Sequence, residues 1–324
     1  MELPVKRWKS PRPKRRPVRG RQPLWLRLLL SALVLAAVAT LVVTLTKGLA
    51  SSSDPTISRQ AVLELWKKSD WKGIRESCDK ALQKQALDVF YLGMKGVASF
   101  YDAMSLPEGG DRDALIADAI VAIRKSLSVG SGDYRSIPKA QLEYVLAKAY
   151  YHSGGSDMDL AASYLKDAEA LGYRASDTHE YLGMIESALG NDAESIAEFD
   201  KALATDSSPM LRIAAASVNL RAGNSPKAEG LLKEAIAATQ DAVATEKARL
   251  LLAKIYFDEA RYDDCRSQLD ALIAENPDSA EAHFQLGLLY QARGDSIHAR
   301  AEWRKAVSID PMHAGARQKL AERS

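Results

Sequence analysis

Apolar residues recur at intervals of three and four positions over most of the chain after residue 55. This is the period of an amphipathic α-helix, and the short polar or glycine- and proline-containing stretches between the runs predict many consecutive helices and few strands. The pattern is clearest near the C-terminus, where two helices are defined by Leu286, Gly287, Tyr290, Ala299, Trp303, Ala306 and Pro311. Gly287 and Ala299 are small where these two helices are expected to cross, so we predict that they pack against each other.

The same pattern recurs upstream at a nearly constant interval. The residues that carry it are Leu146, Ala147, Tyr150, Ala161, Leu165, Leu182, Gly183, Phe199, Ala215, Ala216, Ala228, Leu232, Leu252, Ala253, Tyr256, Cys265 and Leu269. A single helix pair of this kind cannot bury its own apolar face, so each pair is expected to stack on its neighbours. One interval is longer than the others, and residues 235–246 are predicted to extend the end of a helix.

This spacing resembles that of the tetratricopeptide repeat family, whose unit is a helix-turn-helix of about 34 residues. The resemblance spans residues 55–324 and implies an all-α superhelical solenoid of about 5–7 repeats. Divergent helices of the same type are expected over 56–137 and regular repeats over 138–313. Residues 314–324 are expected to form a capping helix, since the end of a solenoid needs a polar outer face.

The N-terminus has a different composition. Residues 28–46 carry no charged side chain and are rich in leucine, alanine and valine. Because about 20 such residues cross a bilayer, one transmembrane helix is predicted over 23–47, after a disordered, basic, proline-rich arm (1–22) and before a linker (48–55). Small residues at 48–50 also fit a cleaved signal peptide, but the lengths of the apolar run and of the preceding arm favour a spanning helix.

The charges are distributed unevenly. Ten Lys and Arg residues precede the apolar run, against one acidic residue, Glu2. This asymmetry predicts a bacterial inner-membrane protein with a cytoplasmic N-terminus and a periplasmic C-terminal domain, and the arm is expected to attract anionic lipid. Residues 48–324 retain 33 of the 44 Lys and Arg and 41 of the 42 Asp and Glu, a formal charge of −8. Such a charge argues against nucleic acid as a partner.

Residues with catalytic potential do not form a recognisable motif. The five histidines lack metal-ligand spacing, and His179 and His283 both fall at a packing position of the repeat. No glycine-rich stretch follows a strand as a phosphate-binding loop does. Cys78 and Cys265 occupy apolar positions in different repeats and are predicted to be buried, unpaired thiols. We therefore expect no enzymatic activity, no metal and no cofactor.

The family resemblance implies that function lies on the concave face, which the first helix of each pair lines. The groove residues it implies are Tyr144, Lys148, Tyr151, Met184, Ile213, Arg221, Leu250, Lys254, Phe257, Phe284 and Leu288. The Lys and Asn pairs with which some members of the family clamp a carboxylate are absent, and part of the set is expected to pack against neighbouring helices. The remaining composition favours an amphipathic helix or an extended apolar segment of a partner protein.

These features predict a membrane-anchored scaffold that binds partner segments in its groove and assembles an envelope complex. Residues 159–183 resemble repeat proteins of the periplasmic collar of spirochaete flagellar motors, so a motor collar is one such complex. The alternative is a periplasmic chaperone or assembly factor for secreted or outer-membrane proteins. Stable, stoichiometric co-purification favours the scaffold, whereas broad and weak capture of clients favours the chaperone.

Overall fold

The computed structural model describes residues 58–130 and 137–322. Within these ranges the chain consists of α-helices joined by short turns and contains no strand, so the predicted all-helical fold is confirmed there. The helices are α2 (Arg59–Lys67), α3 (Trp71–Lys84), α4 (Val89–Ala103), α5 (Gly110–Val129), α6 (Lys139–Ser153), α7 (Met158–Ala170), α8 (Thr178–Ala188), α9 (Asp192–Thr205), α10 (Pro209–Arg221), α11 (Ser225–Ala238), α12 (Ala242–Asp258), α13 (Tyr262–Glu275), α14 (Ala280–Ala292), α15 (Ser296–Ile309) and α16 (Ala314–Ala321).

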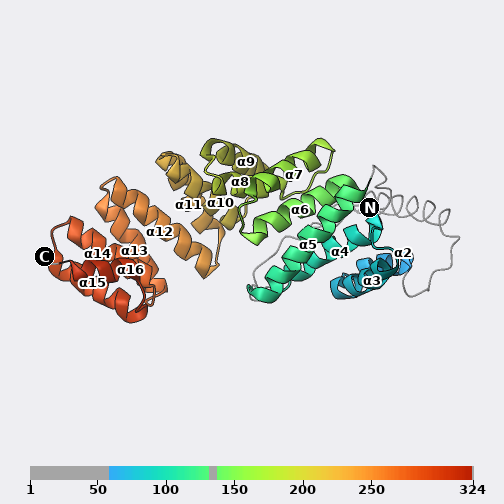
Figure 1. Cartoon of the computed structure of the whole chain (residues 1–324). Helices are drawn as coiled ribbons and strands as arrows, with labels where there is room; N and C mark the ends of the chain where they lie inside the picture. Colours follow the sequence, from blue (N-terminus) through green and yellow to red (C-terminus); the bar gives the residue numbers. More distant parts are fainter. Residues whose placement is uncertain (1–57, 131–136, 323–324) are drawn as a thin grey trace. The chain divides into compact units, whose positions relative to one another are not determined.

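The chain divides into two compact units, Met1–Tyr181 and Leu182–Ser324, and the boundary falls inside α8. In the first unit α4 packs along α5, and α6 packs along α7 (Figure 1). In the second unit α10 packs along α11, α12 along α13, and α14 along α15. The first helices of successive pairs also touch, α4 with α6 and α12 with both α10 and α14. Each unit is thus built from stacked helix pairs.

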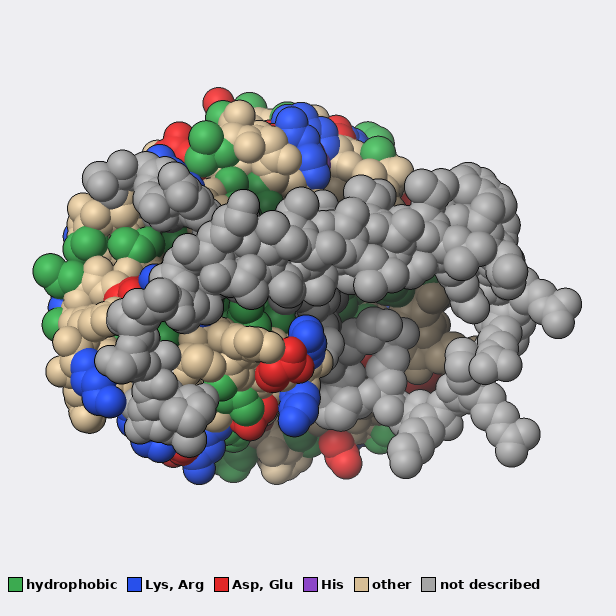
Figure 2. All heavy atoms as spheres, turned by 90° about the vertical axis from the view of Figure 1, so that its right-hand side faces the viewer, with side chains coloured by type: hydrophobic (Ala, Val, Ile, Leu, Met, Phe, Trp, Pro, Cys, Tyr) green, Lys and Arg blue, Asp and Glu red, His purple; other side chains and the backbone are tan. Residues whose placement is uncertain are grey.

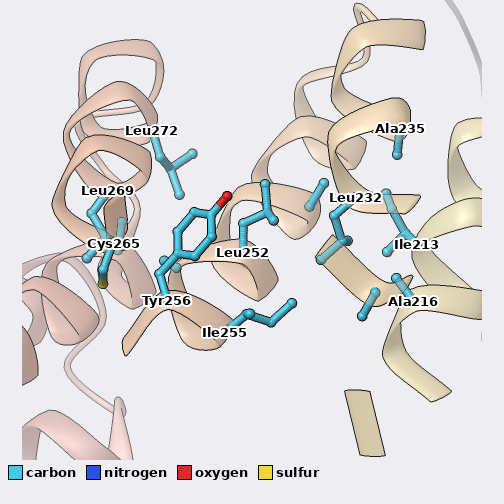
Figure 3. Close-up of a cluster of buried hydrophobic side chains, with 14 of the residues drawn as sticks. Ile213, Ala216, Leu232, Ala235, Leu252, Ile255, Tyr256, Cys265, Leu269 and Leu272 are labelled. Carbon is cyan, nitrogen blue, oxygen red and sulfur yellow. The ribbon is translucent and has the colours of Figure 1, made fainter. Parts of the chain in front are cut away.

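The core of the second unit is shared between successive pairs. Figure 3 shows side chains of α11, α12 and α13 meeting around Leu252 and Tyr256. Leu232, Leu252 and Leu269 are all buried in this cluster. Burial of one such side chain contributes roughly 1.5–3 kcal/mol, so each added pair is stabilised mainly by its neighbours.

The predicted close crossing at Gly287 and Ala299 is confirmed, because a Cβ at Gly287 would meet the backbone oxygen of Ala299 as well as the indole of Trp303. One local prediction is corrected. The predicted helix extension over 235–246 is wrong, because α11 ends at Ala238 and α12 begins at Ala242, after the N-cap residue Asp241. The Asp241 carboxylate accepts hydrogen bonds from the backbone N–H of Val243 (2.8 Å) and Ala244 (3.2 Å), which is N-capping geometry. The residues that make this repeat interval longer than the others therefore lie in the first turns of α12.

The predicted arm (1–22), transmembrane helix (23–47) and linker (48–55) lie outside the described residues, as does the predicted contact with lipid. Among the helices that are described, none combines the length and apolarity needed to cross a membrane. α4 is largely apolar but has 15 residues and carries Lys95 and Asp102. α5 has 20 residues but carries several charges. Since a span needs about 20 mostly uncharged residues, this finding contradicts the predicted localisation in a bacterial inner membrane with a periplasmic domain.

Acidic and basic side chains are interspersed on the surface. On the face shown in Figure 2, Lys and Arg side chains lie among Asp and Glu side chains. In the second unit, ion pairs link successive helix pairs, as between Arg261 and Glu229 (2.8 Å) and between Arg293 and Asp263 (2.5 Å). Exposed pairs of this kind contribute about 0–1 kcal/mol each, so they help to set the stacking but supply little of its stability.

Candidate functional site

Three of the predicted groove residues are buried: Tyr144, Lys148 and Ile213. Ile213, on α10, belongs to the core cluster of the second unit. Tyr144 and Lys148 lie on α6, which packs against α4, α5 and α7. The prediction that these three side chains project into an open groove is therefore corrected. The repeat position identified the helix face, but contacts from neighbouring helices enclose it.

The last two predicted residues, Phe284 and Leu288 on α14, are half-buried and pack against a cluster that includes α16. The centre of the Phe284 ring lies 4.9 Å from that of His313, the N-cap residue of α16. A Cβ at Gly315 would come within 2.7 Å of Phe284 Cζ, so the close approach needs a glycine there. These two side chains thus stabilise the final helix of the chain.

Two further predicted residues make contacts within the helix stack. The exposed Arg221 donates from Nε to Asp192 Oδ1 (2.8 Å) and from Nη2 to Ser187 Oγ (2.9 Å). It therefore ties α10 to α9 and α8. Met184, on α8, is half-buried and packs against the core cluster around Phe199. Whether either residue also contacts a partner stays a prediction.

On α12 the predicted residues form a partly exposed strip. Leu250, Lys254 and Phe257 share one face of the helix at positions i, i+4 and i+7. Leu250 and Phe257 are half-buried against the core, and so is Leu220 on the adjoining α10. Lys254 is exposed and pairs with Asp258 at 2.8 Å. We call Leu220, Leu250, Lys254 and Phe257 the α10–α12 strip, which offers large apolar side chains beside an exposed cation.

The first unit contains a buried ion pair. Lys148 Nζ lies 3.0 Å from Asp177 Oδ2, and the side chains are 5% and 2% exposed. The Tyr144 hydroxyl donates to Asp177 Oδ1, and Lys148 Nζ lies 3.2 Å from that hydroxyl oxygen. Asp177 comes from the turn before α8, so the pair joins two successive helix pairs. A charge buried this far needs such a partner, because an isolated one is strongly destabilising.

Aromatic rings surround the Lys148 ammonium. Nζ lies 4.5 Å from the ring centre of Tyr181, 5.1 Å from that of Tyr144 and 5.8 Å from that of Phe100. These distances are within the range of cation–π attraction, which is strongest where water is excluded. Together with His152, the residues Phe100, Tyr144, Lys148, Asp177 and Tyr181 form what we call the Lys148 cluster.

The polar edge of the Lys148 cluster is formed by His152 and Tyr181. His152 Nε2 lies 3.0 Å from the Tyr181 hydroxyl, and His152 Nδ1 lies 3.4 Å from a guanidinium nitrogen of Arg112. Burial lowers the pKa of His152 to about 4, and the nearby charges of Arg112 and Lys148 act in the same direction. The ring of the predicted groove residue Tyr151 meets that of Tyr181 edge to face at 5.4 Å. Both tyrosines are half-buried.

Sequence reasoning missed four members of the Lys148 cluster: Phe100, His152, Asp177 and Tyr181. Phe100, Asp177 and Tyr181 come from other helix pairs and reach Lys148 only through tertiary contacts, whereas His152 lies one turn after Lys148 on α6. One signal was available, since Lys148 lies four positions after Tyr144 on one helix face and stands between Ala147 and Ala149. A lysine at such a position needs an acidic partner if its ammonium is buried.

Metal-ligand groups and thiols were the remaining candidates for chemistry among the described residues. Among the described residues, no group of three His, Cys, Asp or Glu could hold a metal ion. Cys78 and Cys265 are buried and unpaired, as predicted. Burial raises the pKa of Cys78 to about 12 and that of Cys265 to about 11, so both remain thiols at neutral pH. A thiol is a poor nucleophile compared with a thiolate.

Residues 174–322 match the family model described as a tetratricopeptide repeat-like domain. Among solved structures, the C-terminal part of a repeat-containing protein of this type from Cytophaga hutchinsonii has a TM-score of 0.59 at 15% identity, covering 81% of this chain and 99% of that one. A tetratricopeptide repeat protein from Parabacteroides merdae has a TM-score of 0.50 at 17% identity, covering 81% and 95%.

The Cut9-Hcn1 hetero-tetramer of APC/C gives a TM-score of 0.49 at 15% identity; the match covers 80% of this chain but only 47% of that one. No curated protein sequence matches the chain. The similarities to the Cytophaga hutchinsonii and Parabacteroides merdae structures support the helical-repeat fold alone. Residues 174–322 are thus similar in sequence to the tetratricopeptide repeat-like domain, and most of the chain resembles structures of that fold.

Proposed function

We propose that this chain is a non-catalytic protein–protein interaction scaffold that binds segments of partner proteins along its first helices. The observation that carries the proposal is the α10–α12 strip, where Leu220, Leu250 and Phe257 are neither fully buried nor fully exposed. Protein interfaces concentrate their binding energy in a few such large side chains, each often contributing about 2 kcal/mol or more.

The chemistry of the strip favours a helical partner segment with apolar anchors. Leu250 and Phe257 are two helical turns apart, so they match apolar residues at similar spacing on a partner helix. Lys254 lies between them and has a flexible stem, so it can exchange Asp258 for an acidic residue of the partner. We therefore expect an amphipathic segment with an acidic residue beside its apolar face.

Site-specific photo-crosslinking tests the proposal. A photoreactive phenylalanine analogue at Phe257 should crosslink a discrete partner in cells that express the full chain. The same analogue at Asp270, exposed on the second helix α13, is the matched control. With the purified partner, Phe257→Ala should weaken binding by about 30-fold. Equal crosslinking at the two positions, or normal binding by a normally folded Phe257→Ala variant, would show that the α10–α12 strip is not the partner-binding surface.

The same experiment separates a scaffold from a chaperone. A scaffold should give one or a few partners in fixed stoichiometry, with a complex that survives gel filtration. A chaperone should give many unrelated clients, each at low yield and each released on dilution. No contact among the described residues favours the chaperone, so it remains the alternative predicted from the sequence.

A further inference from the structure

The face of α12 that carries Leu250 and Phe257 continues to the start of the helix. Val243 lies seven positions before Leu250, and Phe257 lies seven positions after it. Residues spaced by seven are two turns apart and drift by only about 20° around a helix, so the three side chains form one row. At 1.5 Å per residue this row is about 21 Å long. We call Val243, Leu250 and Phe257 the apolar row.

The first member of the apolar row comes from the turn that makes α12 long. α12 has 17 residues, whereas α10 and α14, the first helices of the neighbouring pairs, have 13 each. Ala244 buries the inner side of the added turn in the core, while Val243 is 61% exposed on its outer side. Single exposed apolar residues are common on protein surfaces. The alignment of Val243 with two half-buried anchors distinguishes it from these.

Two lysines lie beside the apolar row. Lys247 and Lys254 are also seven residues apart, and each falls between two members of the row along the helix. Lys254 pairs with Asp258 at 2.8 Å. Lys247 is exposed, and its side chain makes no ion pair or hydrogen bond within the described part of the chain. Apolar positions every seven residues with charged positions beside them are the pattern by which paired helices select each other. The face therefore suits a helix that runs along α12.

On the basis of the proposed function, we infer that the partner segment is an acidic amphipathic α-helix that lies along α12 from Val243 to Phe257. Apolar side chains spaced by seven residues on this helix pack on the apolar row, and a carboxylate beside them pairs with Lys247. The helix needs about four turns to reach both ends of the row. A second copy of α12 does not fit this face, because it would bring lysines against lysines.

Mapping of crosslinked sites tests the inference. The photoreactive phenylalanine analogue is placed at Val243 in one protein and at Phe257 in another, each in cells that express the full chain. Both should capture the same partner, and mass spectrometry should find the two crosslinked sites about 14 residues apart in its sequence, as on one helix. An extended segment would give about six residues over the same distance.

The crosslinking results separate the inference from the proposed function. A spacing near six residues, a site on a second copy of this chain, or no crosslink from Val243 while Phe257 captures a partner would overturn the inference and leave the proposed function standing. No specific crosslink from Phe257 would reject the proposed function itself.

Exposed variants then measure the two kinds of contact with the purified partner. Lys247→Glu should weaken binding by about 3–20-fold at ~0.1 M salt, and by less at ~1 M salt, where charges are screened. Lys305→Glu, exposed on the second helix α15, should bind like the wild type. Val243→Ala should bind about 5–15-fold more weakly, while Ile297→Ala, at a position 82% exposed on α15, should not.

Thermal unfolding should be unchanged in all four variants, because none of the replaced side chains is buried. Weakening that is equal in Lys247→Glu and Lys305→Glu, or in Val243→Ala and Ile297→Ala, would overturn the inference.

Discussion

The indole of Trp303 occupies the space that a side chain at Gly287 would need. A Cβ at Gly287 would lie against Trp303 Nε1 and 2.5 Å from Trp303 Cδ1. The indole N–H donates to the backbone carbonyl of Phe284 at 3.3 Å, so the ring lies directly over α14. The glycine therefore permits a close approach of α14 and α15, and its lack of a side chain is a packing requirement.

Gly287→Ala should destabilise the second unit by about 1–3 kcal/mol, because the added methyl group overpacks the contact with Trp303. Intrinsic helix propensity alone predicts a gain of up to ~1 kcal/mol. Gly230→Ala, on α11, is the matched control: nothing lies within 4 Å of its Cβ, so this variant should be stabilised. Urea unfolding of both variants measures the difference. A stabilised Gly287→Ala variant would show that the two helices separate there.

The Lys148–Asp177 pair should behave as a unit in a double-mutant cycle. Lys148→Met and Asp177→Asn each leave one buried charge without its counter-charge, and each should cost about 3–5 kcal/mol. The double variant removes both charges, and the amide oxygen introduced by Asp177→Asn can still accept from Tyr144, so this variant should lose much less than the sum. Chemical unfolding of the four proteins gives the coupling energy. Additive losses would mean that the two charges do not stabilise each other in solution.

The two thiols should resist modification in the folded protein and report on the two units separately. Cys78 lies in the first unit and Cys265 in the second, and both are buried. At a pH of about 8 their raised pKa values keep them as thiols, so a maleimide should react only after unfolding. Mass spectrometry across a urea series would place each labelling midpoint. Rapid labelling of either cysteine without denaturant would contradict its burial.

Glu229 should make the second unit sensitive to acid. Its pKa is lowered to about 2 by hydrogen bonds from Arg261, Lys233 and the Tyr256 hydroxyl. Because the folded-state pKa lies below the ordinary value of 4.5, the carboxylate stabilises the fold above that value, and its contribution is lost as the pH falls toward about 2. Glu229→Gln should therefore be less stable than wild type at neutral pH. The difference in stability between the two proteins should disappear as the pH falls from 4.5 to about 2. Thermal unfolding of both proteins at several pH values measures this difference. A difference that stays constant with pH would contradict the lowered pKa of Glu229.

The predictable part of the site was the identity of the helix faces. The family resemblance assigned Leu250, Lys254 and Phe257 to one groove-lining face, and the structure places them on one face of α12. The same reasoning misjudged Tyr144 and Lys148, whose face is enclosed. Position along a helix predicts on which face a side chain lies. The exposure of that side chain depends on which other helices pack against the face.

The sequence by itself determined the elements that depend on neighbours along the chain. The spacing of Leu286 and Tyr290 defines one helix face, and Gly294, at φ 80°, follows the end of α14, where glycine adopts this conformation without strain. Only the tertiary structure brought Asp177 and Tyr181 to Lys148 from another helix pair. Local periodicity follows from the geometry of one helix, whereas the partner of a buried charge is fixed by how helices distant in sequence pack together.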